Sequence, residues 1–339
     1  MSSRLISHLS KLSAPLVVLA FMTACAPAAS PSAAPTAAAA NQAAPTSAPA
    51  GAAAKPVSLA GATFTVGSKD FSEQLILAQI TEQVLQNAGA TVNDKSNIKG
   101  SVNTRTALTS GAIDMYWEYT GTGWITYLKE TAPLSDPKAQ YDAVAKRDLT
   151  ENKVKWLDPA PLNNTYAFAV RNSALSDLGS PRNLSDLARL AASSPDKATF
   201  CVESEFSTRD DGLPGMLKAY GIPAVDGNVK MLDTGVIYTE TAKGSTCNFG
   251  EVFATDGRIA GLKLTALEDD KHFFPNYNPA LTVRSDVFDK YPQLADVFNP
   301  IARVLDTQTM QTLNSQVDVD GKEPKDVASQ WLKSQGFVK

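Results

Sequence analysis

Short strand patterns alternate with helix patterns along most of this chain, and this alternation constrains its fold more than any other feature. Residues 63–66 alternate polar and apolar side chains as a strand does, and Leu77, Ile80 and Val84 then recur at helical spacing before Gly89. Repeated alternation of this kind predicts an α/β fold. Further helices are predicted at residues 105–111, 136–152, 184–193, 215–220, 287–309 and 324–336, and further strands at 113–118, 155–157, 166–170, 199–202, 230–232, 251–254 and 280–284.

The N-terminal residues predict an export signal that is not part of the fold. Basic residues precede an apolar run over residues 14–22, which is too short to cross a bilayer as a permanent helix. Small residues and then Cys25 follow, a pattern similar to a bacterial lipoprotein signal in which residues 1–24 are removed and Cys25 is lipidated. A plain secretory signal cleaved near Ala26 or Ala28 is the alternative.

Residues 25–58 are almost entirely Ala, Pro, Ser and Thr, with Lys55 as their only charge. A segment without apolar periodicity or large side chains cannot offset its ordering entropy, so a disordered, flexible tether is predicted. A lipidated cysteine, a tether and a globular body indicate an exported protein that is anchored at the outer side of the bacterial cytoplasmic membrane, at the cell surface or in the periplasm.

The part of the chain after the tether has about 280 residues, enough for a large core and more naturally for two lobes than for one. The formal net charge is −4 and no Lys/Arg-rich run occurs, which argues against a nucleic-acid partner. Apart from Cys25, the cysteines are Cys201 and Cys247. In an exported protein such a pair predicts a disulfide, with two buried free thiols as the alternative.

Residues 111–122 read Gly-Ala-Ile-Asp-Met-Tyr-Trp-Glu-Tyr-Thr-Gly-Thr and place three aromatic rings within four positions. An ordinary buried strand would be mostly Val, Ile and Leu, and an ordinary surface loop would not expose such rings. Rings at the end of a strand that opens into a glycine turn indicate a ring presented at a site. The electron-rich face of such a ring attracts a cation, above all one that cannot donate hydrogen bonds.

A candidate anion site lies between the first predicted strand and the first predicted helix. Residues 67–69 predict a turn, and Asp70 with Glu73 has the spacing of a capping box at the start of the helix. Because a helix N-terminus presents free backbone N–H groups, this unit directs those groups and the Lys69 ammonium at one place.

Six blocks of sequence, in the same order, resemble the substrate-binding proteins of ABC importers for glycine betaine, choline and related osmoprotectants. Each block is weak by itself, but the ordered set spreads over residues 64–339 and is a strong signal. The blocks are Val-Gly-Ser-Lys-Asp-Phe-Ser-Glu-Gln at 66–74, Glu-Tyr-Thr-Gly-Thr at 118–122, Thr-Tyr-Ala-Phe-Ala-Val-Arg at 165–171, Glu-Phe-Ser-Thr-Arg-Asp-Asp-Gly-Leu-Pro at 205–214, Thr-Asp-Gly-Arg at 255–258, and Leu-Glu-Asp-Asp-Lys at 267–271 with Phe-Pro-Asn-Tyr at 274–277.

The resemblance implies a two-lobe α/β fold of the type II periplasmic-binding-protein kind, with the ligand cleft between the lobes. Residues 59–164 and 276–339 would form one lobe, and residues 165–275 the other. The lobes would close around the ligand, and the protein would deliver it to a permease subunit and its ATPase. The resemblance implies no cofactor and no metal, and we expect a monomer.

The ligand implied is glycine betaine or a related quaternary ammonium compound. Its trimethylammonium group has no N–H, so cation–π attraction from several rings must recognise it. The resemblance assigns the rings of such an aromatic cage to Tyr119, Tyr166, Phe253 and Tyr277. Position 253 departs from the family, which usually has a tyrosine there. The resemblance assigns the ligand carboxylate to Arg209, Lys69 and Thr122, and the planar fork of arginine suits a carboxylate.

Each of these residues also has an ordinary structural interpretation. A single tyrosine more often packs in a core than lines a cage. Arg209, beside two aspartates, could form a surface ion pair, and Lys69 could be a solvated loop charge. Tyr116 and Trp117 are interpreted as packing residues.

Other function classes stay open. An exported hydrolase that uses paired carboxylates is less expected, because His272 is the only histidine outside the signal and no Gly-x-Ser-x-Gly motif accompanies it, so no enzyme is predicted. A binding protein for choline, carnitine or another small solute is a closer alternative. Arg209 and Lys69 favour a ligand with an anionic end, since choline would leave both cations unpaired.

Overall fold

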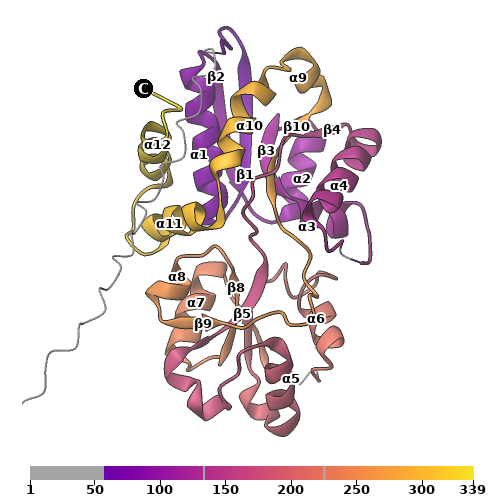
Figure 1. Ribbon diagram of the computed structural model, residues 1–339, viewed down its shortest axis with the longest axis vertical. Helices are drawn as coiled ribbons and strands as arrows, with labels where there is room; N and C mark the ends of the chain where they lie inside the picture. Colours follow the sequence, from indigo (N-terminus) through magenta and orange to yellow (C-terminus); the bar gives the residue numbers. More distant parts are fainter. Residues whose placement is uncertain (1–56, 133, 224–226) are drawn as a thin grey trace, which may run out of the picture. The chain divides into compact units, whose positions relative to one another are not determined.

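The structure is a computed structural model that describes residues 57–132, 134–223 and 227–339. The predicted signal peptide, Cys25 and the predicted tether up to residue 56 lie outside these residues. Two mixed five-stranded sheets divide the described body into two lobes, which confirms the predicted α/β class (Figure 1). Within the described residues, no helix combines the length and the apolar character needed to cross a membrane.

The first lobe has a sheet with the strand order β2-β1-β3-β10-β4, in which β1 pairs parallel with β2 and β3, and β10 pairs antiparallel with β3 and β4. Its strands are β1 (Thr63–Lys69), β2 (Thr91–Ile98), β3 (Met115–Tyr119), β4 (Val154–Trp156) and β10 (Pro279–Arg284). Its helices are α1 (Ser72–Asn87), α2 (Ser101–Thr109), α3 (Thr120–Thr122), α4 (Pro137–Asn152), α9 (Ser285–Lys290), α10 (Leu294–Val304), α11 (Thr307–Asp318) and α12 (Pro324–Ser334).

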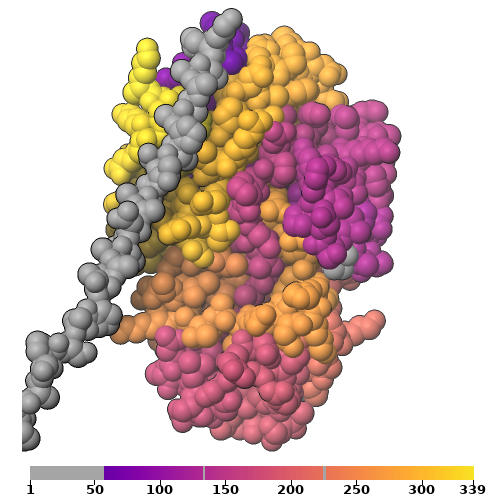
Figure 2. All heavy atoms as spheres, in the orientation of Figure 1, coloured from indigo at the N-terminus to yellow at the C-terminus, as the bar shows by residue number. Residues whose placement is uncertain are grey.

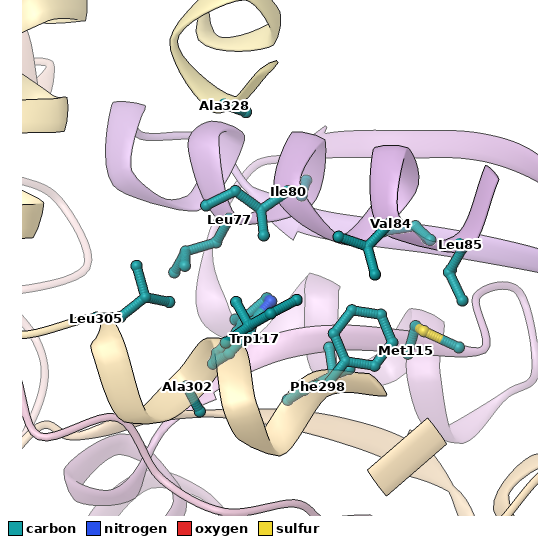
Figure 3. Packing of buried hydrophobic residues seen from close by; sticks show 14 of the residues in the cluster. Leu77, Ile80, Val84, Leu85, Met115, Trp117, Phe298, Ala302, Leu305 and Ala328 are labelled. Atoms are coloured by element: carbon teal, nitrogen blue, oxygen red, sulfur yellow. The ribbon is translucent and has the colours of Figure 1, made fainter. Parts of the chain in front are cut away.

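Helix α1 packs in the core of the first lobe through the apolar stripe that predicted it. Leu77, Ile80 and Val84 are buried and belong to the same cluster as Met115 and Trp117 of β3 (Figure 3). Apolar residues that recur every three to four positions lie on one side of a helix, and this side packs against the sheet. This packing fixes the positions of the C-terminal ends of β1 and β3.

The second lobe has a sheet with the strand order β7-β6-β8-β5-β9. Its strands are β5 (Tyr166–Arg171), β6 (Phe200–Val202), β7 (Val229–Met231), β8 (Phe249–Phe253) and β9 (Leu264–Ala266), and its helices are α5 (Leu184–Ser193), α6 (Leu213–Tyr220), α7 (Thr234–Lys243) and α8 (Arg258–Gly261). Cys201 of β6 and Cys247, just before the neighbouring strand β8, are joined by a disulfide, which confirms the predicted pair. Their Cα atoms are 5.7 Å apart.

Two crossing segments connect the lobes, residues 157–165 between β4 and β5 and residues 267–278 between β9 and β10. They run side by side, because the Asn164 N–H donates to the Tyr277 carbonyl at 3.1 Å. The predicted boundaries between the lobes fall within or at the edge of these segments, and their positions stay a prediction.

The lobes also meet along a seam formed by α8 and α11, whose surfaces adjoin (Figure 2). The Gln311 amide donates to the Ala254 carbonyl at 3.0 Å. Gly257, just before α8, lies directly against Ser315 of α11, so that a Cβ at position 257 would stand 2.5 Å from the Ser315 Cα. Only glycine allows an approach this close.

Several local features of the structure differ from the predictions. The helix predicted over residues 287–309 is three helices, because Pro292 cannot continue α9 and the Asp306 side chain caps a new helix at the Thr309 N–H. Strand β2 was not predicted, since its sequence is polar and largely exposed. The turn predicted at residues 67–69 is wrong, because β1 continues to Lys69.

Candidate functional site

All seven side chains that were predicted to contact a ligand line one cavity of about 50 Å³ between the lobes. They are Lys69, Tyr119, Thr122, Tyr166, Arg209, Phe253 and Tyr277. The first three come from the first lobe, the next three from the second lobe, and Tyr277 from the second crossing segment. The fold therefore brings together positions that are far apart in the sequence.

An aromatic cluster, made of Phe71, Tyr119, Tyr166, Phe253 and Tyr277, forms one part of the cavity wall. Phe71, just before α1, stacks on Phe253 at 5.2 Å and on Tyr119 at 6.1 Å between ring centroids. Tyr166 lies 5.4 Å from Phe253 and meets Tyr277 edge to face at 5.3 Å. Phe71 lies in the block at 66–74 but was not predicted to contact a ligand. A wall of several ring faces suits a group that offers positive charge but no hydrogen bond.

Two of the three phenol groups of this cluster donate to buried carboxylates. The Tyr119 hydroxyl donates to Glu73 at 2.8 Å, and the Tyr277 hydroxyl donates to Asp211 at 2.6 Å. Burial, together with the neighbouring carboxylate, raises the pKa of each phenol well above its ordinary value. Both phenols are therefore neutral over the physiological pH range, and their rings remain available as uncharged walls.

Arg209 is a buried guanidinium with a fixed orientation. Its Nε and Nη2 donate to the two carboxylate oxygens of Asp211 at 2.7 and 2.5 Å, and its Nη1 donates to Glu205 at 2.8 Å. The side chain of Thr122 lies 3.5 Å from Nη2. The interpretation of Arg209 as a surface ion pair is wrong, because the residue is only 8% exposed. The carboxylates of Asp211 and Glu205 fix the orientation of the guanidinium.

Lys69 is likewise buried, at 4% exposure, which rules out a solvated loop charge. Its ammonium pairs with Glu118 of β3 at 2.7 Å and lies 5.1 Å from the centre of the Tyr119 ring. Glu118 also accepts hydrogen bonds from Tyr116 at 2.7 Å and Tyr127 at 2.6 Å. Tyr116 is thus a packing residue, as predicted, and Glu118 is a buried carboxylate that positions the Lys69 ammonium.

Glu205 joins the two lobes at the edge of the cavity. One carboxylate oxygen pairs with Arg209, and the other accepts a hydrogen bond at 2.8 Å from the Ser101 N–H at the start of α2. Burial raises the pKa of the Glu205 carboxyl, but the positive charges of Arg209 and Lys69 lower it by more. The pKa therefore falls from 4.5 to about 2. Glu205 is therefore ionised at all physiological pH values and was not identified from the sequence.

Glu73 does not form the predicted capping box. The residue before α1 is Phe71, and no side chain caps the helix. Instead, four neutral side chains donate to the buried Glu73 carboxylate, namely Tyr119 at 2.8 Å, Asn164 at 3.0 Å, Thr255 at 2.5 Å and Asn314 at 3.1 Å. Burial raises the pKa of Glu73 above its ordinary value, although these hydrogen bonds lower it. The spacing of Asp70 and Glu73 predicted a helix cap, whereas the Glu73 carboxylate accepts hydrogen bonds from residues distant in the sequence.

Comparison with known proteins gives a consistent match. The family described as "OpuAC: Substrate binding domain of ABC-type glycine betaine transport system" matches residues 62–334. The chain is 38% identical over 276 residues to the glycine-betaine-binding protein of Pseudomonas aeruginosa, covering 80% of this chain and 87% of that one. It is 36% identical over 287 residues to the glycine betaine-binding protein YehZ of Escherichia coli K12, and the match covers 83% of this chain and 93% of that one.

Two further proteins are similar to this chain. The solved structure of apo YehZ from Escherichia coli has a TM-score of 0.60 with this chain and covers 84% of it and all of that chain. The ergothioneine transport permease/ergothioneine binding protein EgtU of Helicobacter pylori is 33% identical over 273 residues, which cover 80% of this chain but only 47% of that protein.

Proposed function

This chain belongs to the family of substrate-binding domains of ABC-type glycine betaine transport systems, and on that premise we propose that it binds glycine betaine, or a close quaternary ammonium relative, in the cavity between its lobes. It is the extracytoplasmic binding component of an ABC importer and not an enzyme, with the two-lobe type II periplasmic-binding-protein fold. The observation that carries the proposed ligand is the convergence of five aromatic rings on a cavity that also holds a buried guanidinium.

The trimethylammonium group of the ligand lies against the aromatic cluster. Tyr119, Tyr166, Phe253 and Tyr277 were assigned to a cage from the resemblance, and we include Phe71 in the proposal because it stacks on both Tyr119 and Phe253. Each ring face contributes about 0.5–2 kcal/mol to binding a desolvated cation. Phe253 has a ring but no hydroxyl, so it contributes a face without a hydrogen bond.

The ligand carboxylate lies toward Arg209, Lys69 and Thr122. Both cations line the cavity and are held from behind by protein carboxylates, Arg209 by Asp211 and Lys69 by Glu118. A guanidinium fixed in this way needs no reordering when a ligand arrives, and this lowers the entropic cost of binding.

The proposal extends to the N-terminal part of the chain, whose sequence predicts a lipoprotein signal and a tether. We include in the proposal that Cys25 carries a lipid anchor, that residues 25–58 act as a tether, and that the body works as a monomer that delivers its ligand to the permease. Expression of Cys25→Ser in the native host tests the anchor. The variant should leave the membrane fraction, and an unchanged membrane fraction would refute lipid anchoring.

Calorimetric titration of the signal-free chain tests the proposed ligand. Glycine betaine, proline betaine, carnitine, choline and ergothioneine are titrated separately, and a thermal-shift assay is run in parallel. We expect micromolar-range binding of glycine betaine or a close relative, because several cation–π contacts and a charged hydrogen bond combine. Absence of both heat and thermal shift with all five compounds would refute the proposal.

Ergothioneine is the second candidate ligand. It also combines a trimethylammonium group with a carboxylate, and the Helicobacter pylori relative is named for binding it. In the titration series, tighter binding of ergothioneine than of glycine betaine would favour this candidate.

A further inference from the structure

Glu73 is an unusual carboxylate because it is buried and surrounded by neutral groups. It is 2% exposed, and its four hydrogen-bond donors are two amides and two hydroxyls. A buried charge is costly unless a counter-charge accompanies it. When this carboxyl is ionised, none of its four donors supplies the balancing positive charge, which must then come from outside this group.

The basic groups around Glu73 are already paired with other carboxylates. On β1, Lys69 pairs with Glu118 at 2.7 Å. On α8, Arg258 pairs with Asp256 at 2.5 Å and lies 3.6 Å from Asp318 of α11. None of the ion pairs among the described residues includes Glu73, and the start of α1 supplies only a partial positive charge.

One of the four donors to Glu73 is also a wall of the cavity. The Tyr119 hydroxyl donates to the carboxylate, while the Tyr119 ring lines the cavity. Donation to an anion polarises the phenol and makes its ring face more negative. The charge of Glu73 is therefore felt in the cavity through the ring, without direct contact.

We propose that Glu73 is the fixed counter-charge for the ligand's ammonium group and that it acts through Tyr119, as a positioning residue that selects a cation over a neutral group of the same shape. The inference rests on the proposed function and deepens it. Thr255 belongs to the second lobe and Asn164 to a crossing segment, so the hydrogen bonds of this carboxylate are complete only where the lobes meet. Closure thus assembles a dry negative charge beside the cation.

The experiment compares two ligands that differ in one atom. Glycine betaine and 3,3-dimethylbutanoate share shape and carboxylate, but the second has a carbon in place of the charged nitrogen. Calorimetry measures the first and NMR titration at millimolar concentrations the second. The readout is the ratio of the two affinities, because loss of fold or of lobe closure weakens both ligands alike.

Glu73→Gln should lower this ratio about tenfold, by weakening glycine betaine and not the isostere, as expected when one charge is removed from a partly dry site. Thr255→Val is the matched control. It removes a hydrogen bond to the same carboxylate but keeps the charge, so it should leave the ratio unchanged. The inference would be overturned if Glu73→Gln weakened both ligands equally or changed neither of them. It would also be overturned if Thr255→Val lowered the ratio by the same factor.

A second variant covers the case in which Glu73→Gln does not fold. Tyr119→Phe keeps the ring and the carboxylate but removes the hydroxyl that connects them, so it should also lower the ratio. An unchanged ratio in Tyr119→Phe would overturn the inference. Wild-type binding of glycine betaine is tested separately, so failure of the proposed ligand and failure of the role of Glu73 give different results.

Discussion

The guanidinium of Arg209 is oriented by protein groups before any ligand arrives. Asp211 takes two of its N–H groups and Glu205 a third, and Thr122 approaches from the first lobe. Burial would lower the pKa of Arg209, but Tyr166 and Asp211 raise it well above its ordinary value, so the charge is permanent. A permanent and oriented cation in the cavity wall is suited to a ligand carboxylate.

Arg209→Ala should weaken glycine betaine about 10- to 100-fold, the range expected for losing a charged hydrogen bond, and should change choline much less. Calorimetry with both ligands measures the difference. Retained binding of choline shows that the variant is folded, and Arg303→Ala, on an exposed helix face, is the matched control that should change neither ligand. Equal losses for glycine betaine and choline would contradict the carboxylate role.

Glu251 of β8 predicts a dependence of stability on pH. Burial raises the pKa of its carboxyl from 4.5 to about 8, although the Glu203 N–H that donates to it at 2.7 Å lowers the pKa. Because the folded-state pKa lies above the unfolded one, the stabilising contribution is fully present below pH 4.5 and is lost as the pH rises through 8.

Glu251→Gln should remove this dependence, since the amide keeps the acceptor for the Glu203 N–H and cannot ionise. Urea unfolding at pH 4, 6 and 8.5 measures it. The variant should be more stable than the wild type at high pH, by at most about 5 kcal/mol, and the difference should shrink toward pH 4. A difference that does not change with pH would contradict the account.

At the scale of elements, local signals predicted local structure well. Helices were predicted over residues 136–152 and 184–193, and the structure has α4 and α5 there, capped by the side chains of Asp136 and Asn183. The spacing of Asp70 and Glu73 also predicted a helix cap, and this prediction is wrong. The Glu73 carboxylate instead accepts hydrogen bonds from Thr255 and Asn314, which are distant in the sequence. Spacing along a helix cannot distinguish a cap from a tertiary contact.

The seam between α8 and α11 predicts an effect on affinity from outside the cavity. A side chain at Gly257 would meet the Ser315 backbone, so Gly257→Ala should disfavour the closed arrangement of the lobes. We expect roughly tenfold weaker binding of glycine betaine, the effect of about 1–3 kcal/mol of overpacking.

Calorimetry measures this effect, with Gly321→Ala as the control. Gly321 has a φ of 70° and nothing within 4 Å of the added Cβ, so that variant should lose stability without losing affinity. Unchanged affinity in Gly257→Ala would exclude a role of the seam in closure.

At the scale of the whole molecule, the sequence predicted which side chains would meet but not what holds them. The cavity residues were assigned from ordered blocks, and the fold gathers all seven of them. Their partners could not be predicted, because the pairs are long-range. Lys69 and Glu118 are 49 positions apart, and Glu73 and Thr255 are 182 apart. No local pattern carries such a pairing, because the first exists only once β1 and β3 share a sheet and the second only once the two lobes meet.

A crystal structure of the signal-free chain with glycine betaine would locate both ends of the ligand in the cavity. We expect the ligand nitrogen to lie within about 6 Å of the centres of several rings of the aromatic cluster, with Tyr119 among them. We also expect the ligand carboxylate to accept a hydrogen bond from Arg209. A nitrogen outside the cluster, or a carboxylate directed toward the rings, would contradict the account.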